Sequence, residues 1–115
     1  MLDFCIIGSG VSGSTIAHIL SKKYNVEIFD KARRLGGRAS NKRFIKKQSF
    51  DHGVQYISPR SKSFKKFVQF LYKKKELKIW DGYHLDFTFE KKENKKKFIG
   101  IKGNNVISKV YTKNI

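Results

Sequence analysis

A glycine-rich loop at residues 8–13 constrains the fold of this chain more than any other feature. The loop reads GSGVSG and separates an apolar run at residues 2–7 from a segment, reaching residue 23, whose apolar residues recur at helical spacing. A second apolar run follows at residues 26–30. The order strand, glycine loop, helix and strand is typical of the first half of a dinucleotide-binding unit.

The G-x-G-x-x-G spacing has a physical meaning in this position. Gly8 permits a tight turn, Gly10 lets the backbone approach a pyrophosphate, and Gly13 lets the helix pack closely on the strand. The N-terminus of the helix adds unpaired N–H groups and a partial positive charge. Asp30 ends the second run, where a carboxylate can bind a ribose hydroxyl. A nucleoside-triphosphatase phosphate loop is excluded, because Ser14 stands where that loop needs lysine.

The rest of the chain predicts an α/β protein with short strands and two further helices. We expect strand segments at residues 44–45, 49–50 and 51–57, then a helix at 62–75 capped by Ser61. Period-two patterns predict short antiparallel strands at residues 77–80, 85–90 and 97–101, and a last helix at 103–113. The expected apolar helix faces are Val11, Ile16, Ala17 and Leu20 on the first, Phe64, Phe67, Val68 and Leu71 on the second, and Val106, Ile107 and Val110 on the third.

The chain is strongly basic, with 26 lysines and arginines against nine aspartates and glutamates and a formal net charge of +17. At face value this balance favours a nucleic-acid or anionic-membrane partner. However, 21 of the basic residues are lysines, and Lys, Ile, Phe and Asn together supply 49 of the 115 residues. An AT-rich genome favours these four residues, so we expect no specific nucleic-acid partner. A basic nucleic-acid or anion-binding module stays the alternative.

Two motifs downstream of Asp30 indicate which dinucleotide the chain binds. RLGGR at residues 34–38 matches the R-x-G-G-R element of flavin amine oxidases, and FDHGVQYI follows at residues 50–57. Together with the glycine loop, they make the chain resemble the renalase-like FAD-dependent oxidoreductases, a branch of the flavin amine oxidase superfamily. Weaker matches continue at residues 58–60, 80–82 and 98–105. The resemblance covers essentially this whole chain but only the N-terminal part of a typical family member.

The resemblance implies a role for each residue that matches these motifs, with FAD as the cofactor. Four residues would cradle the pyrophosphate: Gly8, Gly10, Ser12 and Gly13. Asp30 would hold the adenosine ribose. In the second loop Gly36 and Gly37 would pass close to the cofactor, and Arg38 would offset phosphate charge or contact the flavin side. Gln55 and Tyr56 would lie beside the isoalloxazine.

The resemblance therefore implies an enzyme, an FAD-dependent oxidoreductase that oxidises amine-like or reduced nicotinamide donors. No catalytic acid or base is visible in the sequence, and flavin enzymes often need none. An NAD(P)-binding domain is a further alternative, because Lys31 and Arg33 directly after Asp30 suit a 2′-phosphate.

The resemblance also implies a division into a dinucleotide-binding segment at residues 1–60 and an incomplete segment at 61–115 that begins a strand-rich substrate domain. We expect either a truncated gene product or part of a split protein whose missing domain a separate chain supplies. In either case we expect the isolated 115 residues to be inactive.

The remaining residues that could carry chemistry predict no further site. Cys5 lies inside the first apolar run, which predicts a strand buried on both faces, so we expect the cysteine to be a small buried hydrophobe. His18, His52 and His84 lack the spacing of metal ligands, so we assign no metal. The chain has neither an apolar stretch of about 18 residues nor a basic leader. We therefore expect a cytoplasmic protein with no membrane partner.

Overall fold

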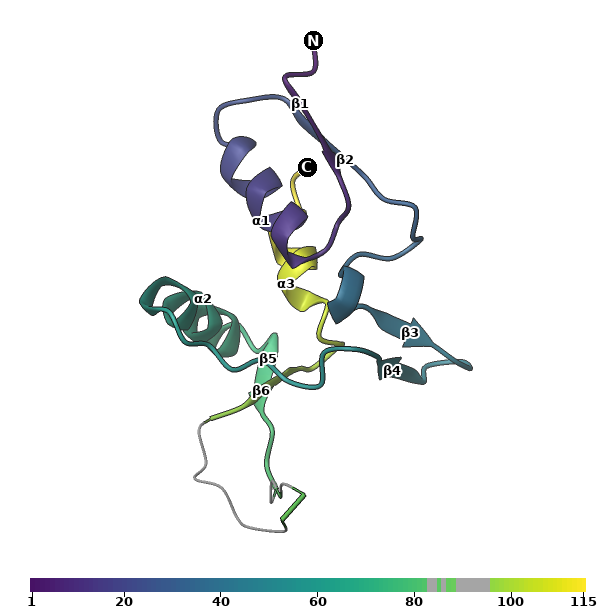
Figure 1. The fold of residues 1–115 in the computed structure, drawn as a ribbon, viewed down its shortest axis with the longest axis vertical. Coiled ribbons are helices and arrows are strands. Elements are labelled where there is room, and N and C mark those ends of the chain that lie inside the picture. Colours follow the sequence, from purple (N-terminus) through teal and green to yellow (C-terminus); the bar gives the residue numbers. More distant parts are fainter. Residues whose placement is uncertain (83–84, 86, 89–95) are drawn as a thin grey trace. The chain divides into compact units, whose positions relative to one another are not determined.

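The computed structural model describes residues 1–82, 85, 87–88 and 96–115 (Figure 1). The chain forms two compact units, one made of residues 1–55 with 102–115 and the other of residues 56–101. Within the described residues, no helix is both long and apolar enough to cross a bilayer.

The first unit begins with the strand, loop, helix and strand that the sequence predicts. β1 (Phe4–Ile7) leads through the glycine loop into α1 (Val11–Leu20), and β2 (Val26–Phe29) returns parallel to β1. Their register pairs Phe4 with Val26 and Ile7 with Phe29. The Gly8 amide extends the ladder by donating to the Phe29 carbonyl at 2.7 Å. The α/β class with a βαβ start is thus confirmed.

Small residues set the distance between α1 and the strands. A Cβ built on Gly13 would lie 2.0 Å from the Gly8 carbonyl oxygen, so only glycine allows this approach. Ser14 and Ala17 are completely buried on the same side of the helix. The expectation that Ile16 belongs to the buried face is wrong, since its side chain is 52% exposed. The face of α1 that packs on the strands is therefore formed by the small residues Gly13, Ser14 and Ala17.

The expectation that the first strand is buried on both faces is also wrong. Ile7 is 82% exposed and Cys5 is exposed, so the cysteine is not the buried hydrophobe that the sequence predicts. The physical reason is the size of the sheet. β1 pairs only with β2 among the described residues, and α1 packs on this pair.

The rest of the first unit consists of a short hairpin and a C-terminal helix. A 3₁₀ turn, η1 (Gly37–Ala39), precedes β3 (Asn41–Arg43) and β4 (Ser49–Asp51), which pair antiparallel around the basic turn. The strand predicted at residues 44–45 is wrong, because β3 ends at Arg43. β4 contains the strand predicted at residues 49–50, but of the one predicted at 51–57 it includes only Asp51. α3 (Val106–Tyr111) buries Val106 and Ile107 as predicted.

α3 packs against α1 and so brings the end of the described chain into the first unit. The rings of His18 on α1 and Tyr111 on α3 lie 4.9 Å apart between centroids. For this reason the compact units do not coincide with the boundary at residue 60 suggested by the sequence. The division into a dinucleotide-binding segment and a substrate-domain segment stays a prediction.

The second unit is a helix packed on a two-stranded antiparallel ladder. α2 (Lys62–Lys73) begins at Ser61, whose hydroxyl oxygen accepts from the Phe64 amide at 3.3 Å and confirms the predicted cap. Val68 and Leu71 are completely buried, and α2 packs against β5 (Leu77–Ile79). β5 pairs with β6 (Phe98–Gly100). Of the strand predicted at residues 85–90, the structure describes only residues 85, 87 and 88, which belong to none of the three ladders.

The contact at Gly13 gives the first prediction, that Gly13→Ala destabilises the fold. Alanine in a helix normally adds about 0.5–1 kcal/mol of stability over glycine, whereas overpacking against fixed atoms costs about 1–3 kcal/mol. The backbone contact with Gly8 should dominate, so we expect a net loss of more than about 1 kcal/mol in urea unfolding.

Gly10→Ala is the matched control for this substitution. Gly10 has an ordinary φ of −65°, and a Cβ there would lie 3.8 Å from the nearest backbone atom. The free energy of unfolding of the Gly10→Ala variant should differ from that of the wild type by no more than about 0.5 kcal/mol. Equal stabilities for the two variants would show that helix and strand are not in contact at Gly13.

Candidate dinucleotide-binding site

The two glycine loops of the first unit meet backbone to backbone. Gly10 and Gly36 form a parallel bridge, and the Gly36 amide donates to the Ser9 carbonyl at 3.0 Å. A Cβ built on Gly37 would lie 3.1 Å from the Gly10 Cα. A side chain at Gly37 would crowd the first loop, so glycine there lets the backbones of GSGVSG and RLGGR contact each other directly.

Conformation requires glycine at some of these positions and space requires it at others. Gly8 has a φ of +100° with nothing near its Cβ position, so the turn alone favours glycine there. Gly36 has a φ of +120°, and its Cβ would also lie 2.7 Å from the Asn105 Cβ. Gly10 has an ordinary φ, so its conformation does not explain the glycine. The space around its Cβ position does not explain it either, since the nearest atom, the Gly37 Cα, is at an ordinary contact distance of 3.8 Å.

Ser9 connects the first loop to the end of β2. Its amide donates to Asp30 Oδ2 at 2.6 Å, and its hydroxyl donates to the same oxygen at 2.5 Å. Its carbonyl accepts from Gly36 and from the Ser14 hydroxyl, the latter at 3.0 Å. The residue is 1% exposed. The sequence shows Ser9 only as a variable position of the motif, and no local signal marks this role.

The Asp30 carboxylate is held in its ionised form. Hydrogen bonds from the Ser9 hydroxyl, the Ala32 amide and the Ser9 amide, in that order of size, and the charge of neighbouring Lys31 outweigh desolvation and lower the pKa of Asp30 from 3.8 to about 2. The Ala32 amide donates to Oδ1 at 2.8 Å. Above about pH 4 this side chain therefore carries a full negative charge in the folded protein.

A cavity of about 410 Å³ lies beside Ser9 and Asp30. Leu35 from the second loop and Glu27 and Ile28 from β2 line it, together with Thr112 and Ile115. Ser9 and Asp30 follow the carboxyl ends of the two parallel strands, which is the edge where open α/β sheets bind their ligands. The volume falls within the range of small-molecule sites.

Two buried asparagines ahead of α3 brace the segments that follow the second loop. Asn104 donates from its side chain to the Val54 and Gln55 carbonyls at 2.9 and 3.2 Å, and its amide donates to Asp51 at 2.8 Å. Asn105 donates to the Leu35 carbonyl at 3.2 Å. Both asparagines lie in the weakly matching segment at residues 98–105, and the sequence predicts no role for either of them.

The other predicted site residues are placed as follows. Ser12 is exposed on the first turn of α1, and the Arg38 side chain is exposed at η1. The Arg38 carbonyl accepts from the Val54 amide at 3.0 Å. Gln55 is exposed, and its carbonyl is one of those that Asn104 binds.

Tyr56 belongs to the second unit. There its ring lies 5.8 Å from that of Trp80, and the Lys97 ammonium lies 4.5 Å from its centroid.

The neighbours of His52 give it a structural place. Its Nε2 lies 3.1 Å from the Ser40 hydroxyl. Within the described residues, no three His, Cys, Asp or Glu side chains are grouped closely enough to hold a metal ion.

The parallel β1–α1–β2 unit, its packed glycine loops and the anchored carboxylate define a dinucleotide-binding fold. The chain belongs to the NAD(P)-binding Rossmann-like domain family, whose model matches residues 6–71.

Among solved structures the fold is similar to that of putrescine oxidase, in structures from a redesign of its cofactor binding. The wild-type enzyme bound to putrescine gives a TM-score of 0.52 and 24% identity over 81% of this chain and 21% of that one. A variant with alanine replaced by cysteine gives 0.53 and 24% over 79% and 21%. The chain thus spans about a fifth of the length of these proteins.

The Ser9–Asp30 contact generates the second prediction, that Ser9→Ala raises the pKa of Asp30. The hydroxyl bond is the largest cause of the depressed pKa. Its loss should move the pKa from about 2 toward 3.8 but not all the way, because both amides still donate. Carboxyl-carbon NMR across an acid titration measures this shift.

Ser12→Ala is the control, because it also removes a serine hydroxyl from this loop, but one that forms no hydrogen bond with Asp30. A pKa unchanged by Ser9→Ala, or shifted equally by Ser12→Ala, would contradict the contact. The depressed pKa also fixes the sign of the pH effect. The ionised Asp30 stabilises the fold above about pH 4, and this contribution is lost as the pH falls toward about 2.

Proposed function

We propose that this chain is the FAD-binding N-terminal portion of a flavin-dependent oxidoreductase whose donors are amine-like or reduced nicotinamide compounds. The observation that carries the proposal is the packing of the RLGGR loop on the GSGVSG loop beside Asp30. The first loop alone would suit any dinucleotide. The second loop resembles that of the flavin amine oxidases in sequence. Its close backbone contact with the first loop explains why residues 36 and 37 are both glycine.

The first loop fits a pyrophosphate. Gly8 and Gly10 leave the backbone bare where the chain turns into α1, and Gly13 draws the helix close to the strand. The first amides of a helix have no partner within it and carry partial positive charge. In our proposal, these three glycines and Ser12 hold the two phosphates of FAD. Gly36 and Gly37 let the second loop approach the same group.

Asp30 retains the capacity to bind a ribose. An ionised carboxylate offers about four acceptor sites. Two donors from Ser9 occupy Oδ2 and one from Ala32 occupies Oδ1, so Oδ1 can accept one more hydrogen bond. Its low pKa keeps the group an acceptor at neutral pH. A ribose hydroxyl is a suitable donor for this position.

The remaining residues act on the cofactor's charge and surroundings. Within the described part of the chain, the Arg38 guanidinium forms no hydrogen bond, so its fork can bind a phosphate oxygen or the flavin side. Gln55, whose carbonyl is tied to Asn104, and Tyr56 are proposed to lie beside the isoalloxazine. When bound, FAD supplies the chemistry by accepting a hydride from the donor.

A nicotinamide dinucleotide is the second candidate, and the match to the NAD(P)-binding Rossmann-like family favours it. FAD and NAD(P) share their adenosine diphosphate half, so Ser9, Asp30 and the first loop would serve either. FAD and NAD(P) differ in their other half, a flavin in one and a nicotinamide in the other, which lies beyond the phosphates that the second loop would approach. The two cofactors can therefore be separated only by comparing them directly.

Asp30→Ala gives the third prediction, measured by calorimetry of the whole chain with FAD, NADP⁺, ADP-ribose and riboflavin. Hydrogen bonds to a charged group contribute about 1.5–3 kcal/mol. The variant should therefore bind FAD and ADP-ribose about ten-fold or more weakly. Riboflavin lacks the adenosine half, so its affinity should not change. Wild-type chain should bind FAD more tightly than NADP⁺.

Asp30→Asn is the matched control, because it keeps the shape of the side chain and removes the charge. An equal loss for riboflavin would mean that the substitution unfolds the site. Equal affinities of the wild type for FAD and NADP⁺ would leave the dinucleotide site standing and overturn its assignment to flavin.

A further inference from the structure

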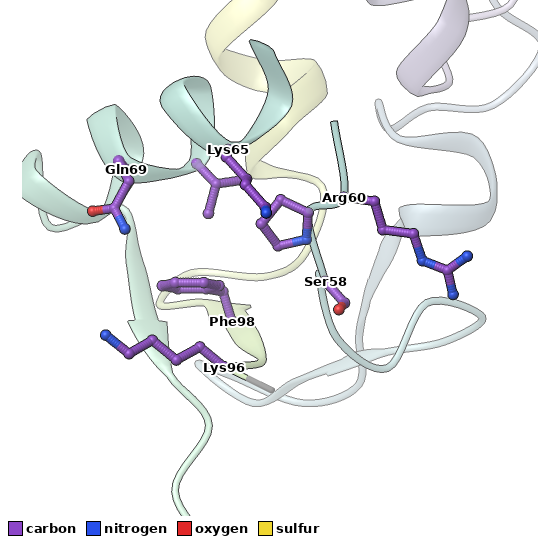
Figure 2. A pocket seen from close by; sticks show the side chains of 8 residues that line it. Ser58, Arg60, Lys65, Gln69, Lys96 and Phe98 are labelled. Carbon is purple, nitrogen blue, oxygen red and sulfur yellow. The ribbon is translucent and has the colours of Figure 1, made fainter. Parts of the chain in front are cut away.

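The second unit contains a cavity of about 550 Å³ between α2 and β6, lined by none of the residues proposed to bind FAD (Figure 2). The residues that line it are Ser58, Pro59, Arg60, Lys65, Val68, Gln69, Lys96 and Phe98. Figure 2 shows Lys65 and Gln69 coming from α2 and facing Phe98 and Lys96 across the space. The volume is that of a typical small-molecule site.

The apolar part of this cavity is fixed in place. Phe98 is 4% exposed, and two hydrogen bonds to Ile57 hold its backbone, since Ile57 donates to its carbonyl at 2.7 Å and accepts from its amide at 2.9 Å. Its ring also meets that of Tyr72 edge-on at 5.8 Å. Val68 of α2 is completely buried and Pro59 is half-buried. Phe98 and Pro59 therefore offer an apolar surface to a ligand.

The polar part of the cavity is cationic. Among the residues that the structure describes, Lys65 and Lys96 line it, and no acidic residue does. Within the described residues, neither ammonium group has a carboxylate partner. The Arg60 guanidinium is directed away from Phe98 in Figure 2, so the two lysines carry the positive charge inside. Gln69 adds a neutral amide that can donate to a ligand oxygen.

We infer that this cavity binds a small organic anion, a carboxylate or a phosphate monoester whose apolar body lies against Phe98 and Pro59. The ammonium groups of Lys65 and Lys96 attract the anionic head, and the ring and the proline contact the body. An amine cation carries the same positive charge as these two groups and would be repelled by them, so this cavity is unsuited to one. The inference is independent of the proposed flavin site, since none of the residues that line the cavity is among those proposed to bind FAD.

Fluorine NMR of the whole chain with four small probes tests the ligand class. The probes are 4-fluorophenyl phosphate, 4-fluorobenzoate, neutral 4-fluorobenzyl alcohol and cationic 4-fluorobenzylamine, which share a ring and differ in charge. We expect saturable binding of at least one anion, at least about ten-fold tighter than the alcohol, and no binding of the amine. Tighter binding of 4-fluorophenyl phosphate would indicate a phosphate ligand, and tighter binding of 4-fluorobenzoate would indicate a carboxylate. Equal binding of the anions and the alcohol, or binding of none, would overturn the inference.

Two matched pairs of variants test the location. Lys65→Gln and Lys96→Gln should each weaken the anion about three-fold, the effect expected of one partly exposed charge. Lys66→Gln and Lys97→Gln make the same change one residue further along. Neither Lys66 nor Lys97 lines the cavity, and Lys97 instead lies over the Tyr56 ring. Lys65, Lys66 and Lys96 are exposed and Lys97 is half-buried, and circular dichroism checks the folding of all four variants. Equal losses within both pairs would show that only the net charge attracts the anion.

Discussion

Ser9 bonds to three separate parts of the first unit, and the arrangement of the proposed site depends on these contacts. Its amide and hydroxyl hold Asp30 at the end of β2, while its carbonyl accepts from Gly36 in the second loop and from Ser14 on α1. All of its hydrogen-bonding groups are thus satisfied inside the protein. The loop, both strand ends and the helix start are fixed together before any ligand arrives, which lowers the entropy lost on binding.

The absence of side chains where the two glycine loops meet costs backbone entropy and gives an advantage in ligand access. Glycine loses more backbone freedom on folding than other residues, and the described chain places several glycines at positive φ. Buried asparagines offset part of this cost, since Asn105 bonds to the Leu35 carbonyl and Asn104 to the segment before Tyr56. The advantage that we propose is access, because backbone amides rather than side chains would face a bound dinucleotide.

The features that the sequence predicts correctly are local. The β1–α1–β2 order, the Ser61 cap and the buried face of α2 each follow from residues within a few positions of one another. Burial of Cys5 and Ile16 depends on what packs around them, and both predictions were wrong. The asparagine contacts join residues 49 to 70 positions apart, which no periodicity or motif spacing indicates. The role of Ser9 was invisible for the same reason, since its partner lies 21 residues away.

Backbone amide NMR of the whole chain titrated with FAD tests most directly whether the packed glycine loops form the cofactor site. The account predicts that the amides of residues 9–13, those of Asp30 and Ala32, and those of residues 36–38 shift together, with one common saturation curve, and that ADP reproduces the changes at the first loop and at Asp30. Shifts confined to the lysines of α2, or an unchanged first loop at saturating FAD, would contradict it.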